Sequence, residues 1–232
     1  MEILLSDCSS VIKDLIKMRD KKEKERADKI INRLRKAYPD VKSAIESETP
    51  FQLLIATILS AQCTDERVNI VTKDLFKKYK KPADYLKVSN SELEKDIFST
   101  GFYRQKAKNI KLTCKKLLED YDGEVPVNFD ELTKLPGVGR KTASVVAGNA
   151  FKIPAIAVDT HVRRLSNLLG FISSKNVEKI EERLKELFAK KDWVNLSHWL
   201  ATHGRIICIA RRPKCNECFL SDLCPGFQSS VK

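Results

Sequence analysis

The chain has 232 residues, of which 42% are hydrophobic and 32% charged, a composition typical of a soluble globular protein with one or two domains. No apolar run approaches the ~18 residues of a transmembrane helix, and the opening MEILLSDCSSVIKDLIK, interrupted by Glu2 and Asp7, is not expected to act as a signal peptide. Lys and Arg outnumber Asp and Glu by 43 to 31, for a net charge of +12. This excess suits a polyanionic partner, nucleic acid first and an anionic membrane surface second, although general solubility also accounts for it.

Apolar residues recur at helical spacing through almost the whole chain. The first 26 residues are charge-mixed, and we interpret them as either an added helix or a loose tail. The stretch FQLLIATILSA is apolar all round, which predicts a central buried helix. The one strand-like run, AIAV at 155–158, has no obvious partner strand, so we predict an all-α fold. In chain order, helices are expected at about 27–38, 51–61, 65–79, 103–121, 130–135, 140–151, 160–170, 177–190 and 192–208.

A glycine turn separates two of these helices, in KLPGVGRKTASVV at 134–146. Pro136 stops the preceding helix, while Gly137 and Gly139 allow backbone angles that other residues resist and leave the amides uncovered. Free amides at the positive end of a helix bind phosphate. A helix-hairpin-helix that holds one DNA phosphate is therefore favoured over an ordinary helix–helix turn, because the chain is strongly basic.

Lys141 follows this turn directly, beside Arg140. Most lysines are solvated surface charges. Here, however, the positive helix end and Arg140 both disfavour protonation of the amine, and a neutral lysine amine is a nucleophile that forms Schiff bases with aldehyde carbons. Asp159, in AIAVDTHVRRL, is first of all a helix N-cap. A carboxylate held at a cap is also fixed well enough to act electrostatically.

The seven cysteines are unevenly distributed. Cys8, Cys63 and Cys114 are scattered, whereas the C-terminal run CIARRPKCNECFLSDLC has the spacing C-x6-C-x2-C-x5-C. Four thiolates at this density suit one zinc ion or one [4Fe–4S] cluster better than four unrelated buried thiols. Such crowding indicates an intracellular protein with a metal or cluster site. The cysteines are Cys208, Cys215, Cys218 and Cys224. The cations just before and among them, suited to a phosphate backbone, are Arg205, Arg211, Arg212 and Lys214.

Three elements in this order, LPGVGRKTASVV at 135–146, IAVDTH at 156–161 and the four-cysteine tail, resemble endonuclease III. This family consists of base-excision DNA glycosylases of the helix-hairpin-helix superfamily. LLIATILSAQCTD at 53–65 and GFYRQKAKNI at 101–110 also fit its pattern, so that the resemblance covers about residues 27–225.

The resemblance implies a two-lobed all-α fold with an iron–sulfur cluster. One lobe would be a six-helix barrel at 43–153, with the helix-hairpin-helix at about 130–150. The other would combine 27–42 with 154–232 and hold a [4Fe–4S] cluster, bound by the four C-terminal cysteines, as the only cofactor. Residues 1–26 would form an N-terminal extension outside the resemblance.

The resemblance also assigns roles to residues. Lys141 matches the Schiff-base lysine and Asp159 the catalytic aspartate. Gln62 matches the residue that fills the gap left by an extruded base, and Phe102 stands where a second intercalating residue, usually leucine, is expected. The hairpin residues Gly137, Val138, Gly139 and Arg140, with the basic residues of the cysteine loop, would contact the DNA backbone.

The implied function is that of a bifunctional DNA glycosylase and AP lyase. Such an enzyme removes oxidised pyrimidines and cuts the strand 3′ to the abasic site by β-elimination. We expect it to act as a monomer on double-stranded DNA that contains damaged bases or abasic sites. A mismatch or adenine glycosylase of the same superfamily is the nearest alternative. Those relatives generally lack the lysine, and the adenine-specific branch has a further C-terminal domain that we do not expect here. A non-catalytic DNA-binding module and a colourless zinc-binding adaptor are alternatives from other classes.

Overall fold

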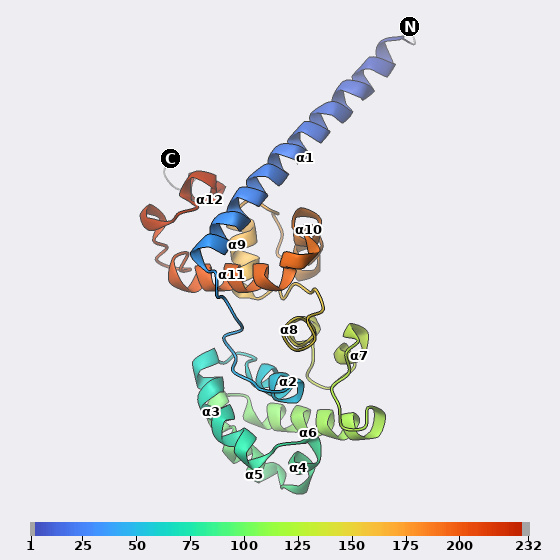
Figure 1. Cartoon of the computed structure of the whole chain (residues 1–232), viewed down its shortest axis with the longest axis vertical. Helices are drawn as coiled ribbons and strands as arrows, with labels where there is room; N and C mark the ends of the chain where they lie inside the picture. The colour runs from blue at the N-terminus through green and yellow to red at the C-terminus, as the bar shows by residue number, and fades with distance from the viewer. Residues whose placement is uncertain (1–2, 229–232) are drawn as a thin grey trace. The chain divides into compact units, whose positions relative to one another are not determined.

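The computed structural model describes residues 3–228, with side chains from residue 17 onward, and within that range it contains helices, turns and loops but no strand. The predicted all-α architecture is thus confirmed (Figure 1). Among the described residues, no helix combines the length and the apolar character that crossing a bilayer requires. The strand-like run at 155–158 is a connection without regular secondary structure in which Ile156 and Val158 are buried, and this burial explains its apolar residues.

The chain divides into two compact units. Unit 2 is the continuous segment Lys42–Ala157, and unit 1 is formed by the residues before it together with those after it. The assignment of the expected barrel and cluster lobes to these units stays a prediction.

Unit 2 is built around one helix that is buried on nearly all sides. Of the ten residues of α2 (Pro50–Leu59), only Pro50 and Gln52 are not buried, as the all-round apolar sequence predicts. It packs against α3, α6 and α8. The other helices of this unit are α3 (Asp65–Lys78), α4 (Pro82–Lys87), α5 (Asn90–Asp96), the 3₁₀ turn η1 (Phe98–Thr100), α6 (Tyr103–Asp120), α7 (Phe129–Thr133) and α8 (Arg140–Ala150).

Short polar side chains begin most of these helices. A side-chain oxygen of the N-cap residue accepts a hydrogen bond from a backbone amide of the first turn, and so satisfies a donor that has no partner within the helix. The bonds to Thr49, Thr64 and Ser89 are 3.1, 3.3 and 3.1 Å long. Helix α4 is absent from the sequence-based expectation because six residues are too few to display a helical period.

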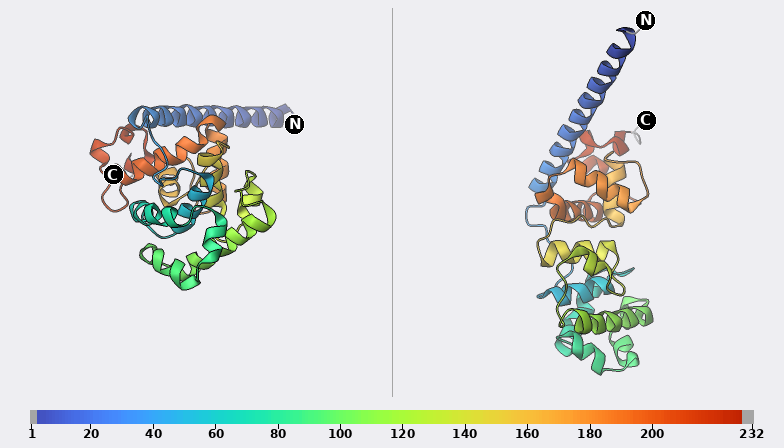
Figure 2. Two further views of the ribbon diagram at one scale, coloured as in Figure 1. Left: turned by 60° about the horizontal axis from the view of Figure 1, so that its bottom comes forward. Right: turned by 90° about the vertical axis from the view of Figure 1, so that its right-hand side faces the viewer.

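In unit 1 the C-terminal part of a long helix, α1 (Ile3–Ala37), packs by one face along the side of the other helices and contacts α11 (Figure 2). The backbone of the expected N-terminal extension is therefore helical from Ile3 and continues without a break into the helix expected at 27–38. The remaining helices are α9 (Thr160–Leu168), α10 (Val177–Leu187), α11 (Trp193–Ile206) and α12 (Pro225–Gln228), with the 3₁₀ turns η2 (Lys190–Asp192), η3 (Cys215–Glu217) and η4 (Ser221–Leu223).

Polar side chains of α1 join it to the rest of unit 1. The Arg26 guanidinium donates hydrogen bonds to the carbonyl oxygens of Leu169, Gly170 and Leu223, and lies over the Phe171 ring. Glu23 pairs with Arg183 at 2.8 Å. The carbonyls at the end of α9 have no helical partner, so an arginine beside them satisfies them and complements the negative end of the helix dipole.

Candidate functional site

The glycine turn at 134–139 has the geometry of a hairpin between two helices. Asn128 caps α7, the Val138 amide donates to the Leu135 carbonyl at 3.0 Å, and α8 begins at Arg140. Gly137 has φ +76°, a left-handed angle that glycine adopts without steric cost. Val138 is only 5% exposed and its amide already donates to Leu135, so the exposed backbone of this turn is that of Gly137 and Gly139.

Helix α6 contacts this hairpin through two side chains. The Thr113 hydroxyl donates to the Pro136 carbonyl at 2.6 Å. A Cβ on Gly137 would lie 2.8 Å from the Asn109 amide nitrogen, closer than such atoms approach, so this close packing also requires glycine. The Arg140 guanidinium lies 5.5 Å from the centre of the Phe129 ring and joins the starts of α7 and α8.

The start of α8 is open to a ligand. Gly139 is its N-cap and supplies no side-chain acceptor, and nothing lies within 4 Å of the position that a Cβ there would take. Uncapped amides at a positive helix end form an anion site. Lys141 is exposed in the first turn of this helix, next to exposed Arg140, so the amine and the amides share one end of α8.

Asp159 is the N-cap of α9, the structural role that its sequence position predicts. Its Oδ1 atom accepts a hydrogen bond from the Val162 amide at 2.7 Å, and the side chain is half-buried. The cap fixes the carboxylate while leaving part of it accessible. Asp159 belongs to unit 1 and Lys141 to unit 2.

Two further left-handed turns in unit 2 carry the predicted intercalating residues. Gln62 has φ +53° and Phe102 has φ +48°, angles that cost a non-glycine residue on the order of 1 kcal/mol each. Both side chains are exposed, and Phe102 is 65% exposed. A large aromatic side chain held in a strained turn and left in solvent indicates a contact surface.

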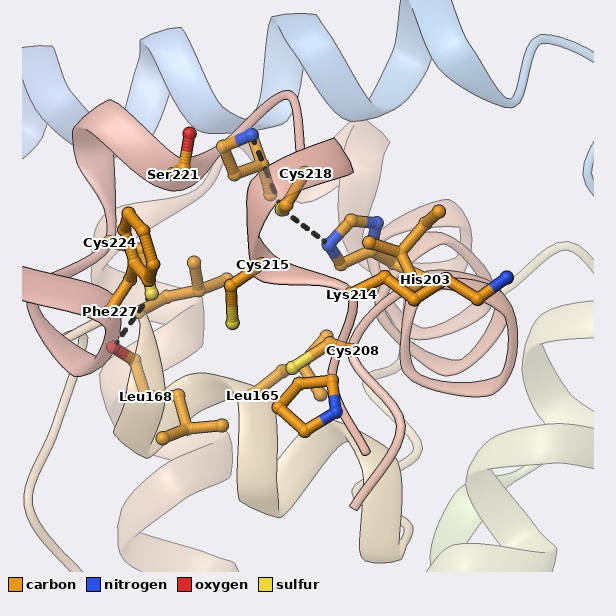
Figure 3. A pocket seen from close by; sticks show the side chains of 14 residues that line it. Leu165, Leu168, His203, Cys208, Lys214, Cys215, Cys218, Ser221, Cys224 and Phe227 are labelled. Carbon is orange, nitrogen blue, oxygen red and sulfur yellow. Dashed lines mark hydrogen bonds between the residues drawn. The ribbon is translucent and has the colours of Figure 1, made fainter. Parts of the chain in front are cut away.

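The four C-terminal cysteines line one pocket in unit 1, with apolar walls that include Leu165, Leu168 and Leu220. Figure 3 shows the sulfur atoms pointing into this shared space. Cys208 follows α11, Cys215 is the first residue of η3, Cys218 follows η3, and Cys224 follows η4. None of the four is in a disulfide. Burial raises the pKa of the Cys208 and Cys218 thiols. These thiols therefore lose their protons when they bind a metal as thiolates.

The donor set of this pocket fits an iron–sulfur cluster. Within the described residues, no group of three or more His, Cys, Asp or Glu side chains converges as the ligands of one metal ion would. Zinc draws four sulfurs to ~2.3 Å from one point, whereas in a [4Fe–4S] cluster each cysteine binds a different iron. Four cysteine sulfurs that line one pocket supply the number and kind of ligands that a [4Fe–4S] cluster takes.

His203 was not among the predicted site residues, and the structure places it in the wall of the cysteine pocket. His203 is 2% exposed, and burial lowers its pKa to about 4. Its Nδ1 atom lies 3.0 Å from the Tyr38 hydroxyl, and Nε2 lies 3.4 Å from the Cys218 sulfur. A neutral imidazole has one donor and one acceptor, so in the tautomer whose Nδ1 accepts from Tyr38, Nε2–H donates to the sulfur.

The cysteine loop also presents the predicted cations at the surface. Its backbone closes through the Lys214 amide and the Ile207 carbonyl at 2.9 Å, and the Arg164 guanidinium donates to the carbonyls of Gly204 and Cys208. Arg164 was not among the predicted residues, because the sequence pattern of an amphipathic helix predicts that a cation at this position is exposed to solvent. The exposed cations of this region are Arg205, Arg211, Arg212 and Lys214.

Comparisons with known proteins agree with this geometry. Residues 55–190 match the model of the HhH-GPD superfamily base excision DNA repair protein, and residues 208–224 match the iron–sulfur binding domain of endonuclease III. Endonuclease III of Synechocystis sp. is 49% identical over 90% of this chain and 95% of its own length. That of Bacillus subtilis is 51% identical over 84% and 90%.

A solved structure described as a trapped endonuclease III–DNA covalent intermediate superposes with a TM-score of 0.87 at 46% identity, covering 90% of this chain and 99% of its own. These matches confirm the expected helix-hairpin-helix glycosylase fold and a [4Fe–4S] cluster as cofactor. The chain therefore belongs to the endonuclease III family of base excision DNA repair proteins.

Proposed function

We propose that the chain, as a monomer, removes oxidised pyrimidines from double-stranded DNA and that Lys141 is the nucleophile. Membership of the family makes it a DNA glycosylase with AP lyase activity. The lesion class, the residue roles and the monomeric state are the proposal. Its main support is the exposed Lys141 in the first turn of a helix whose amides are uncapped. An endonuclease III of the same fold has been trapped as a covalent intermediate with DNA.

The reaction begins with backbone binding and extrusion of the base. The amides of the exposed Gly137 and Gly139, with Arg140, hold one phosphate, and the basic residues of the cysteine loop bind others. Flipping a base out of the duplex costs a few kcal/mol, least for a lesion that stacks badly. Gln62 fills the gap that is left, and Phe102 inserts beside it.

Lys141 then forms a covalent bond to the sugar. Its amine attacks C1′ while the bond from C1′ to the base breaks, and the electron pair leaves with the base, which takes up a proton. Opening of the sugar ring gives an iminium between Nζ and C1′. Loss of a C2′ proton and cleavage of the C3′–O3′ bond cut the strand 3′ to the abasic site. Asp159 stabilises the positive charge on the sugar or assists deprotonation of the lysine.

Cys208, Cys215, Cys218 and Cys224 are the proposed ligands of the [4Fe–4S] cluster. The role that we assign to the cluster is structural. By binding one cysteine before the basic loop and three after it, the cluster fixes the loop that carries Arg211, Arg212 and Lys214.

The role of Lys141 is tested by reductive trapping. Borohydride should join wild-type protein to abasic duplex DNA covalently, because it reduces the iminium to a stable amine. Lys141→Gln should lose the adduct. Lys134→Gln, at an exposed position in the same motif, should retain it. An undiminished adduct from Lys141→Gln, seen by denaturing electrophoresis, would contradict the assignment.

The role of Asp159 is tested by separating its charge from its cap. Asparagine caps helices as well as aspartate, so Asp159→Asn should preserve folding and binding of undamaged DNA while slowing single-turnover base release on the order of a hundredfold or more. Asp159→Ala should in addition lose ~1 kcal/mol of unfolding free energy with the cap. Equal activity of Asp159→Asn and wild type would show that Asp159 acts only as a helix cap.

Substitution of one cysteine tests the proposed ligand set. Wild-type protein should be brown and contain iron and acid-labile sulfide in equal amounts. Cys215→Ser should lose the visible absorbance and most of the iron. Cys63→Ser, at a half-buried cysteine outside the C-terminal run, should keep both. Full cluster content in Cys215→Ser would remove Cys215 from the set.

The lesion class is tested with duplexes that carry thymine glycol, an abasic site, a G·T mispair or an A·G mispair. We expect base release from thymine glycol and cleavage at the abasic site, with the mispairs intact. Preferential release from a mispair would make the chain a mismatch glycosylase, and binding without any cleavage would indicate a DNA-binding module.

A further inference from the structure

Lys106 is a buried cation with no part in the mechanism above. It lies on α6 and is 4% exposed, although lysine is almost never fully buried without a partner. Among residues 17–228, no carboxylate pairs with it, and burial lowers its pKa. Since an unpaired buried charge is costly, the contacts of this ammonium group call for an explanation.

The ammonium binds two backbone carbonyls from separate parts of unit 2. Its Nζ atom donates to the carbonyl of Leu59 at 2.8 Å and to that of Thr100 at 2.8 Å. Leu59 is the last residue of α2, and Thr100 is the last residue of η1. Carbonyls at helix ends have no partner within the helix and carry partial negative charge, which favours a cation beside them.

Each carbonyl stands just before one of the strained turns. Leu59 precedes Gln62 by three residues, and Thr100 precedes Phe102 by two. The Lys106 amide also donates to the Phe102 carbonyl at 3.0 Å. A single residue thus joins the starts of both turns to α6, and all of these groups belong to unit 2.

We propose that Lys106 is a positioning residue for base extrusion, holding the turns of Gln62 and Phe102 in the conformation that inserts into DNA. This inference rests on the proposed function and extends it to a residue that touches no substrate. Left-handed turns at non-glycine residues persist only where their surroundings enforce them. An apolar side chain at position 106 would leave two buried carbonyls unpaired and allow each turn to relax toward a less strained conformation.

The test measures extrusion separately from chemistry. Lys106→Met removes the donors at similar volume, Lys106→Arg keeps the charge, and Lys115→Met removes an exposed lysine from the same helix as a matched control. Extrusion is followed by the fluorescence of 2-aminopurine opposite a thymine glycol. Base release is measured in single turnover and divided by the fraction of protein that borohydride traps on abasic DNA, which counts correctly folded molecules.

In Lys106→Met we expect normalised base release and the fluorescence change to fall at least about tenfold. Cleavage of a duplex that already lacks the base should fall less, because less has to be extruded. Lys106→Arg should recover part of the loss, and Lys115→Met should match wild type. In a Phe102→Ala background, Lys106→Met should have a much smaller effect, because the two residues act through one turn.

Three outcomes would overturn the inference. These are unchanged normalised base release in Lys106→Met, an equal loss on damaged and abasic duplexes, and effects of Lys106→Met and Phe102→Ala that simply add. If Lys106→Met does not fold, the same measurements are made on Lys106→Arg. If Lys106→Arg is then less stable than wild type but shows full activity and an unchanged fluorescence signal, Lys106 is purely structural. Failure of wild-type protein to form any borohydride adduct would instead refute the proposed function.

Discussion

One face of α6 supports the three turns of unit 2 that carry Gln62, Phe102 and Gly137. Lys106 binds the carbonyls that precede Gln62 and Phe102, while Asn109 and Thr113 contact the hairpin at Gly137 and Pro136. Residues at positions 106, 109 and 113 share one side of a helix because of its 3.6-residue period. Turns from distant parts of the sequence are therefore fixed relative to one another by a single rigid element.

This arrangement concentrates polar contacts where the backbone is least regular. Helix ends and left-handed turns leave carbonyls and amides without regular partners, and the buried side chains of Lys106 and Thr113 satisfy some of them. The amides at the start of α8 receive no side-chain cap from Gly139. The same unit thus contains carbonyls that are satisfied internally and amides that are left for a phosphate.

In unit 1, buried side chains order a loop that has little regular secondary structure. Between α11 and α12 only two short 3₁₀ turns form, so the loop obtains its shape from Arg164, from His203 and from the cysteines that face the pocket. In the family that this chain belongs to, a [4Fe–4S] cluster occupies such a centre. The exposed cations of the loop gain a fixed position from these buried contacts, which is what backbone binding requires.

The sequence by itself determined the features that depend on neighbouring residues. The helical period, the Pro-Gly-Val-Gly hairpin and the C-x6-C-x2-C-x5-C spacing are local patterns, and they predicted the all-α fold, the hairpin at Gly137 and a four-cysteine centre. Local spacing also identified Asp159 as an N-cap. Only the tertiary structure decided that Lys106 is buried, that the Val138 side chain faces the core and that His203 contacts Cys218. The run RQKAKNIKLTCKK by itself predicts that Lys106 is one of several surface cations. Its burial and its hydrogen bond to Leu59 depend on α2, and Leu59 is 47 residues away in the sequence.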